Sequence, residues 1–205
     1  MYLPQFQRVE DTQTLLAFMR EHPFTNVITS TSGVAAVSHI PVLAFRDGDG
    51  IRLRGHMARS NDHSALLDGD APTVVVFQGP HAYVSPLMYD DAGAGPTWDY
   101  IAVQASGHTR VLDDDDTHEF LHELLAAFDP DFRARWDAAD EALRTRMVGG
   151  IAAFEMDVTG LDAIYKLGQN RSKEGQARIA SHLSASNDTN AAALGRTMAE
   201  RLEQT

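Results

Sequence analysis

Alternating apolar and polar positions run through the first half of the chain and predict a series of β-strands. Such runs cover residues 24–30, 34–45 and 51–57, and two Asp-Gly pairs at 47–50 separate the last two runs. Asp-Gly supplies the positive φ angles that tight hairpin turns require, so we expect these strands to form a meander. Ser32 and Gly33 mark the turn between the first two strands.

A β-branched run at residues 73–77 continues the sheet. We expect Gln78-Gly79-Pro80 to break this run, because glycine accepts unusual dihedral angles and proline withholds a backbone donor. Strand-like alternation resumes at residues 81–85. A loop with Gly93, Gly95 and Pro96 then leads into the aromatic segment at 97–100. The aromatic, imidazole, amide and carboxyl side chains around these turns indicate either the wall of a site or a hairpin whose aromatics fill a core.

Helical periodicity appears at residues 11–21 and again in the second half of the chain. Four acids at 113–116 precede an apolar-periodic segment, which is typical of a helix N-terminus rather than of a calcium loop. The remaining expected elements are strands at 101–112 (with a bulge at Gly107) and 151–158, helices within 128–147, at 172–183 and at 190–202, and a polar, basic connector at 164–172. The pattern therefore predicts a mainly β fold with peripheral helices, in the α+β class.

The composition is that of a globular protein, and it argues against several classes of function. The chain has 205 residues, of which 43% are hydrophobic and 22% charged, and no apolar run is long enough to span a bilayer. Its first residues lack a basic segment followed by an apolar one, so we expect a cytoplasmic protein. Zero cysteines exclude disulfides and thiolate chemistry. A net charge of −12 weighs against a surface that binds nucleic acid through its phosphates.

One motif resembles a metal site. The run His118-Glu119-Phe120-Leu121-His122 matches the HExxH pattern of zinc proteases, in which two histidines share one face of a helix. No third ligand follows in a family arrangement, and so short a pattern arises by chance on amphipathic helices, so we expect no metal. The chain has no GxGxxG loop, P-loop or GxSxG elbow, and no catalytic residue is assigned.

A phosphate site is indicated where the third strand leads into a short helix. Ser60 or Asn61 would cap that helix and leave free backbone N–H groups at its start, with Arg59 and His56 beside them. An ordinary capped helix with a solvated arginine explains the same residues, and spacing alone does not decide between the two interpretations.

Five segments together resemble the PaiB-like family of FMN-binding proteins. They are MYLPQFQ at the start, GHMARSN at 55–61, VVFQGPHAYVSP at 75–86, PTWDY at 96–100 and KLGQNRS at 166–172. This family is similar in architecture to pyridoxamine-phosphate-oxidase-like flavoproteins. The resemblance implies a split β-barrel homodimer with FMN at the subunit interface. It implies an FMN-binding domain at residues 1–183 and leaves a C-terminal helical extension at 184–205.

The resemblance also implies which residues bind FMN. The phosphate end would lie against His56, Met57, Arg59, Ser60 and Asn61, and the isoalloxazine ring against Ser38, His39, Thr97 and Trp98. From the other subunit, where positive charge favours a reduced, anionic flavin, the contributors would be Lys166, Gln169, Asn170 and Arg171. The family motifs more often read PTWNY and KLSQNRS, whereas this chain has Asp99 and Gly168.

Two functions are compatible with the resemblance. The family is named for negative regulation of transcription, so one function is a negative regulator that acts through flavin or senses it, although the acidic charge argues against direct DNA binding. The alternative is an FMN-dependent oxidoreductase or flavin reductase with no role at DNA. A basic, histidine-containing site in this fold could also take another planar anion, such as haem.

Overall fold

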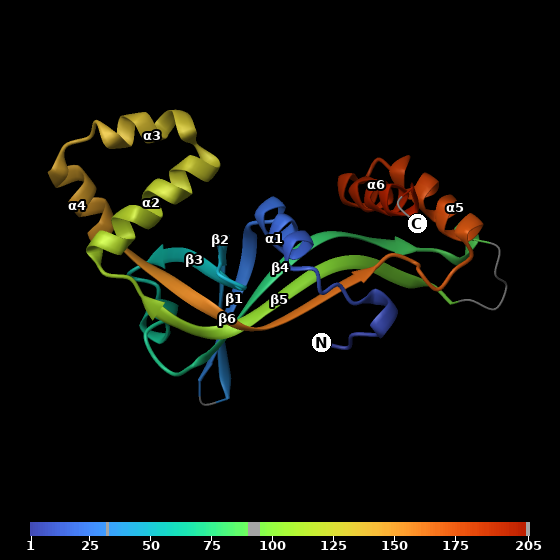
Figure 1. Ribbon diagram of the computed structural model, residues 1–205, viewed down its shortest axis with the longest axis horizontal. Helices are drawn as coiled ribbons and strands as arrows, with labels where there is room; N and C mark the ends of the chain where they lie inside the picture. The colour runs from blue at the N-terminus through green and yellow to red at the C-terminus, as the bar shows by residue number, and fades with distance from the viewer. Residues whose placement is uncertain (32, 90–94, 204–205) are drawn as a thin grey trace. The chain divides into compact units, whose positions relative to one another are not determined.

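Six strands close into a barrel in this computed structural model, which describes residues 1–31, 33–89 and 95–203 (Figure 1). The strands are β1 (Phe24–Thr31), β2 (Val34–Asp47), β3 (Gly50–Ala58), β4 (Pro72–Val84), β5 (Thr97–Val111) and β6 (Ile151–Lys166). Around the barrel their order is β1-β2-β3-β6-β5-β4, and β1 pairs antiparallel with both β2 and β4. The predicted mainly β fold with peripheral helices is confirmed.

The meander at the start of the sheet forms as the sequence indicates. β2 and β3 pair as a hairpin that ends at Asp47 and Gly50, and Gly48 takes a φ of 56°, which an Asp-Gly turn requires. β1 and β2 pair antiparallel in a register that sets Ser38 opposite Val27. Gly33 takes a φ of 85° in the turn between β1 and β2, as expected there, whereas Ser32 and residues 90–94 of the expected loop lie outside the described residues.

Two strands are longer than the pattern indicates. β4 continues through Gly79 and Pro80, both of which are buried, so the predicted break there is wrong. Proline's fixed φ is compatible with an extended chain, and only its missing N–H restricts where it can lie in a sheet. β6 runs on to Lys166, so the connector predicted from residue 164 begins only after this strand.

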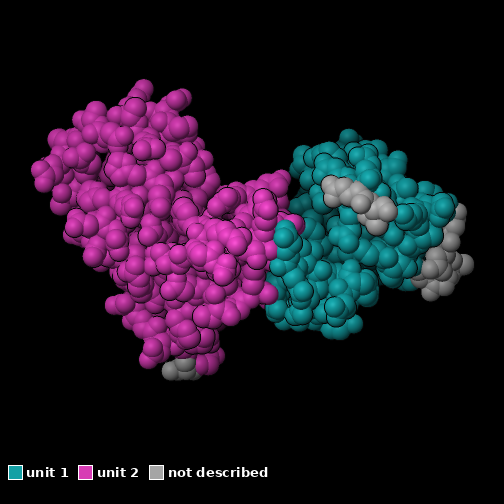
Figure 2. Space-filling view, viewed as in Figure 1, with its two compact units in different colours: residues 1–11, 78–103, 162–205 teal, residues 12–77, 104–161 magenta. Residues whose placement is uncertain are grey.

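The chain divides into two compact units, which Figure 2 colours separately. Unit 1 comprises residues 1–11, 78–103 and 162–205, and unit 2 comprises residues 12–77 and 104–161. β4, β5 and β6 each contribute residues to both units. This division does not follow the order of the chain, and the boundary expected at residue 183 stays a prediction.

Unit 2 holds most of the sheet and four of the longer helices of the described chain. They are α1 (Thr12–Glu21), α2 (Asp114–Phe128), α3 (Pro130–Asp137) and α4 (Glu141–Gly149), together with the short 3-10 helix η2 (Asp62–Leu66). Apolar side chains with no exposed surface fill the core, among them Val27, Leu53 and Phe154. α2 packs on the sheet through Phe120, which contacts Leu112 and Ala153. The acidic run at the start of α2 acts as expected, because Asp113 caps the helix: its Oδ1 accepts a hydrogen bond from the backbone N–H of Asp116 at 2.8 Å.

Unit 1 contains the last part of β4, the first part of β5 and the last part of β6. It also contains a pair of helices, α5 (Lys173–Ser184) and α6 (Thr189–Glu203), which lie side by side (Figure 1). Its short 3-10 helices are η1 (Gln5–Gln7) and η3 (Pro86–Met88). Ile179 and Leu194, one from each long helix, are almost completely buried. Among the residues that the structure describes, no helix is both long enough and apolar enough to cross a membrane.

Candidate functional site

Three polar side chains from β2 and η2 form a connected hydrogen-bond cluster in unit 2. Ser38 Oγ lies 2.8 Å from Nδ1 of His63, and the Asn61 amide donates to Ser38 Oγ at 3.2 Å. Asn61 Oδ1 also accepts from the backbone N–H of His63 at 3.0 Å. Ser38 and Asn61 are two of the expected ring-binding and phosphate-binding residues, and the structure brings them together.

The local sequence explains why the chain turns here. Side chains of β3 alternate between buried and outward positions until the strand ends at Ala58, and Asn61 then caps η2. η2 has only five residues, so its dipole is weak and one of its free N–H groups is already used by Asn61. Any phosphate binding at this turn therefore depends on side chains more than on the helix.

His63 was not among the residues expected from the sequence. It is 4% exposed, and burial lowers its pKa, which favours the neutral ring. While Nδ1 faces Ser38, the buried Nε2 has no hydrogen-bond partner among the described residues. Such an atom needs a partner, because an unsatisfied buried polar group costs about 1–3 kcal/mol. The only sequence signal was its place two residues after the cap, which is compatible with many solvent-exposed histidines.

His56 and Met57 point to opposite sides of β3. Met57 is buried on the same side as Leu53, whereas the His56 ring lies on the outer side and packs at a centroid distance of 5.7 Å on Phe120 of α2. Burial lowers the pKa of His56, so the ring favours the neutral form. Its Nδ1 is buried without a partner among the described residues. A neutral histidine is a weaker phosphate ligand than the sequence suggested, and its role in FMN binding stays a prediction.

Arg59, Ser60 and the ring-side residue His39 are all exposed. Arg59 is held through both its backbone and its side chain. Its backbone N–H donates to Gly150 O at 3.0 Å, and its Nε donates to Gly149 O at 3.2 Å. These bonds hold the arginine beside the end of α4 and fix the direction of its guanidinium. Arg59 thus sits next to the Asn61 cap as a cation open to solvent.

In unit 1 the expected ring-side residues lie at the start of β5. Lys166 Nζ donates to Thr97 Oγ1 and to the carbonyl of Trp98, and it lies 3.6 Å from Asp99 Oδ1. Trp98 is 56% exposed, which is a large fraction for an indole. Lys166 therefore binds the segment 97–99 of its own chain, a contact that the sequence did not indicate.

Asp99, the first departure from the family motif, is 2% exposed. Burial raises the pKa of its carboxyl, and the nearby Lys166 and Arg171 partly oppose that shift. Gly168, the second departure, has a φ of 70°, and a Cβ built on it would lie 3.6 Å from Asp99 Oδ2. The two residues that differ from the motif are thus neighbours in space.

The other connector residues are also held within unit 1. Gln169 donates to Tyr165 O and accepts from Leu167 N–H at 2.8 Å, which closes the turn after β6. The Arg171 guanidinium lies 4.1 Å from the ring centroid of Tyr89 and donates to its hydroxyl at 3.2 Å. Asn170 is exposed. Whether these residues contact a flavin on another subunit stays a prediction.

The HExxH residues make other contacts. His122 Nδ1 lies 3.1 Å from Asp137 Oδ1, and Glu119 pairs with Arg54 at 3.7 Å. Within the described part of the chain, no three His, Asp or Glu side chains are arranged to hold a metal ion.

The donors in unit 2 fit the polar part of a flavin mononucleotide. A phosphate monoester needs a cation and several N–H or O–H donors, and Arg59, Ser60 and Asn61 offer these on one exposed turn. Next to that turn lies the buried Nε2 of His63, which has no hydrogen-bond partner in the part of the chain that the structure describes. The residues present therefore fit the group.

Comparison with known proteins gives the same cofactor. The family described as "Putative FMN-binding domain" matches residues 1–160. Over 206 aligned residues the chain is 29% identical to the protease synthase and sporulation protein PAI 2 of Bacillus subtilis, covering 100% of this chain and 99% of that protein.

Two solved structures share the fold at low sequence identity. The FAD and heme binding protein of Mycobacterium smegmatis superposes with a TM-score of 0.65 at 17% identity, covering 83% of this chain and 79% of that one. The flavocytochrome Anf3 of Azotobacter vinelandii superposes with a TM-score of 0.62 at 15% identity, covering 80% and 71%. The expected split-barrel fold is confirmed. The match over residues 1–160 shows that this chain belongs to the FMN-binding, PaiB-like family, with FMN or a closely related flavin as its cofactor.

Proposed function

We propose that this chain is a cytoplasmic, homodimeric flavoprotein that binds FMN between its subunits and acts through the state of that flavin. The observation that supports the site is the Ser38–Asn61–His63 cluster beside the exposed cation of Arg59. In this proposal Arg59, Ser60 and Asn61 bind the phosphate, and Ser38 and His39 border the ring. His56 and Met57 would support the end of β3, the strand that leads to these phosphate-binding residues.

The second set of contacts would come from unit 1 of the partner subunit. Thr97 and Trp98 would lie near the ring, and Lys166, held by Asp99, would keep their segment in place. Gln169, Asn170 and Arg171 would border the flavin from the connector that follows β6. FMN, when bound, would supply the capacity to accept and release electrons, for which the chain itself offers no cysteine.

The test is an FMN titration followed by flavin fluorescence. Arg59→Ala is expected to weaken FMN binding by about tenfold to a hundredfold, since a hydrogen bond to a charged group contributes about 1.5–3 kcal/mol. The matched control is Arg46→Ala, because Arg46 Nε donates to Gly48 O at 3.1 Å in the same kind of exposed bond. Equal affinities of the two variants would show that the phosphate binds elsewhere.

The relative named for protease synthesis and sporulation makes a regulatory role the first interpretation. A net charge of −12 argues that such a role would be indirect, with the flavin sensed by the protein and the signal passed to another component. Mobility-shift assays at physiological salt, with and without FMN, test this. Salt-dependent binding to DNA would show a direct regulator instead.

A second candidate is an FMN-dependent oxidoreductase that has no role at DNA. The exposed Trp98, which borders a cavity in unit 1, favours it, because a redox flavin needs space for a second reactant. Oxidation of NADH or NADPH in the presence of FMN, above the rate with free FMN, would support this function.

A further inference from the structure

A cavity of about 300 Å³ lies entirely within unit 1. Its walls are the far part of β4, the start of β5, and the helices α5 and α6. The volume is at the lower end of the range for small-molecule sites, about 300–1,000 Å³, so it suits a compound of one or two rings.

Three aromatic side chains form one side of this cavity. Trp98 is 56% exposed and Tyr83 46% exposed, and their ring centroids lie 6.2 Å apart in an edge-on arrangement at 68°. The His81 ring lies 6.2 Å from Trp98 at 39°. Large exposed rings grouped at a cavity provide a stacking surface for another planar group.

The opposite side supplies hydrogen-bonding groups. Asn190 at the start of α6 accepts from the backbone N–H of His81 at 3.1 Å, and its amide nitrogen lies 3.2 Å from each ring nitrogen of His81. This contact fixes the His81 ring in the cavity wall. His182 on α5 brings a second imidazole, which is exposed. An imidazole can donate or accept, which matches the ring nitrogen or amide edge of a heterocycle.

The charge of the cavity distinguishes it from the expected FMN site. Among the described residues that line it there is no lysine or arginine, and the one carboxylate, Asp188, already accepts from the backbone N–H of Asn190 at 2.8 Å. An anion in the cavity would therefore meet a carboxylate and no lysine or arginine among the lining residues, which is unfavourable.

We propose that this cavity is a second ligand site, separate from the FMN phosphate site, for an uncharged planar nitrogen heterocycle such as a pyridine carboxamide. Trp98 and Tyr83 stack against the ring, and His182 binds its polar edge, while His81 is held in the wall by Asn190. The inference requires that the flavin ring does not fill this cavity, and Trp98 is the one residue that both sites would share.

Equilibrium dialysis of the full-length protein tests the proposal with two probes that differ in charge. Nicotinamide is expected to bind saturably, and nicotinate, which has the same ring with a carboxylate, is expected to bind at least about tenfold more weakly. Equal or tighter binding of nicotinate would overturn the proposal, as would the absence of saturable nicotinamide binding at millimolar concentrations.

Variants locate the site. Trp98→Ala and His182→Ala are each expected to weaken nicotinamide binding by about threefold to tenfold, which corresponds to the loss of one stacking or hydrogen-bonding contact. His108→Ala is the control, because His108 is an exposed histidine on β5 in unit 2. Unchanged binding in both cavity variants would place the probe elsewhere. Dialysis is repeated with FMN at saturation, and competition between the two ligands would show that the cavity belongs to the flavin site.

Discussion

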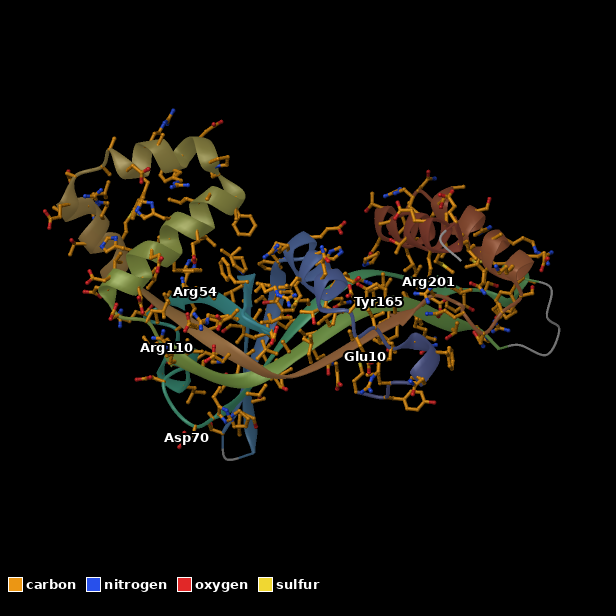
Figure 3. All side chains as sticks on the ribbon, in the orientation of Figure 1. Glu10, Arg54, Asp70, Arg110, Tyr165 and Arg201 are labelled. Atoms are coloured by element: carbon orange, nitrogen blue, oxygen red, sulfur yellow. The ribbon has the colours of Figure 1, made fainter. Side chains whose placement is uncertain are left out.

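At the scale of single residues, the buried carboxylate of Glu155 connects three strands of unit 2. Its side chain is 5% exposed and accepts from Arg54 Nε at 2.9 Å and from Arg110 Nη2 at 2.8 Å. Figure 3 labels both arginines. Burial alone would raise the pKa of Glu155, but the hydrogen bonds from the two arginines outweigh it and lower the pKa.

Glu155→Gln is expected to lower the free energy of unfolding by about 3 kcal/mol at pH 7, because it leaves paired cations without their buried partner. The folded pKa lies below the unfolded value of about 4.3, so the carboxylate stabilises the protein above that pH and loses this effect as pH falls through the folded pKa. Urea unfolding from pH 7 to pH 3 checks both points. The control is Asp70→Asn, since Asp70 is an exposed carboxylate of the same unit. A difference from wild type that stays constant over this range would contradict the assignment.

Asp99 has the opposite behaviour. Its pKa is raised by burial, so its contribution to stability is present at low pH and is lost as pH rises through the folded pKa. The Asp99→Asn variant should not show this loss of stability as pH rises. At a pH above the folded pKa, where the Asp99 carboxyl is ionised, the substitution should also strengthen FMN binding by about threefold to tenfold, because one negative charge near the proposed ring site is gone.

FMN titration and unfolding of Asp99→Asn and wild type, both followed over a pH series from 3 to 9, measure both effects. Asp162→Asn serves as the control in the same unit, where the carboxylate is 43% exposed. FMN affinity that is unchanged or weaker in Asp99→Asn would separate Asp99 from the flavin site.

At the scale of elements, β5 and β6 approach each other closely at Gly107. A Cβ built on this glycine would lie 2.3 Å from the backbone oxygen of Asp157, so one strand would have to move. Gly107→Ala is expected to cost at least about 2 kcal/mol in unfolding free energy, a value typical of overpacking against rigid atoms. Gly149→Ala at the end of α4 is the control, because nothing lies within 4 Å of its built Cβ. Chemical denaturation measures the unfolding free energy of both variants. Equal stability of Gly107→Ala and Gly149→Ala would contradict the close approach of β5 and β6.

Most elements could be predicted from periodicity, and the exceptions have physical causes. The Asp-Gly turn, α1 and the capped start of α2 depend on local chemistry, which the sequence carries directly. The lengths of β4 and β6 depend on pairing with distant strands, which overrides the local break at Gly79 and Pro80.

The candidate site was only partly predictable for a similar reason. Asn61 could be found as a cap, and Arg59 as its neighbouring cation, because both effects act within a few residues. The link from Ser38 to His63 spans 25 residues and depends on how η2 lies against β2. The contact between Lys166 and Asp99 depends on the pairing of strand ends, and no spacing in the sequence indicates it.

At the scale of the whole molecule, the residues implied to bind FMN are divided between the two compact units. Ser38, Arg59 and Asn61 belong to unit 2, whereas Trp98 and Lys166 belong to unit 1. A homodimer offers one way to complete each site, with one unit from each subunit. Exposed apolar residues on β2 fit such an interface, since Val34 is 73% exposed and Val37 51% exposed, and Val37 directly precedes Ser38.

Val37→Asp is therefore expected to weaken dimerisation and FMN binding together. Burying an unpaired carboxylate in an interface costs about 2 kcal/mol or more, which raises the dimer Kd roughly thirtyfold or more. Because only the dimer would complete the site, raising the protein concentration should restore FMN binding by mass action. Sedimentation equilibrium and FMN titration at several protein concentrations measure both quantities. Met147→Asp, a change at an apolar residue of α4 that is 48% exposed, is the control. A Val37→Asp monomer that binds FMN as tightly as wild type would show that a single subunit holds the complete site.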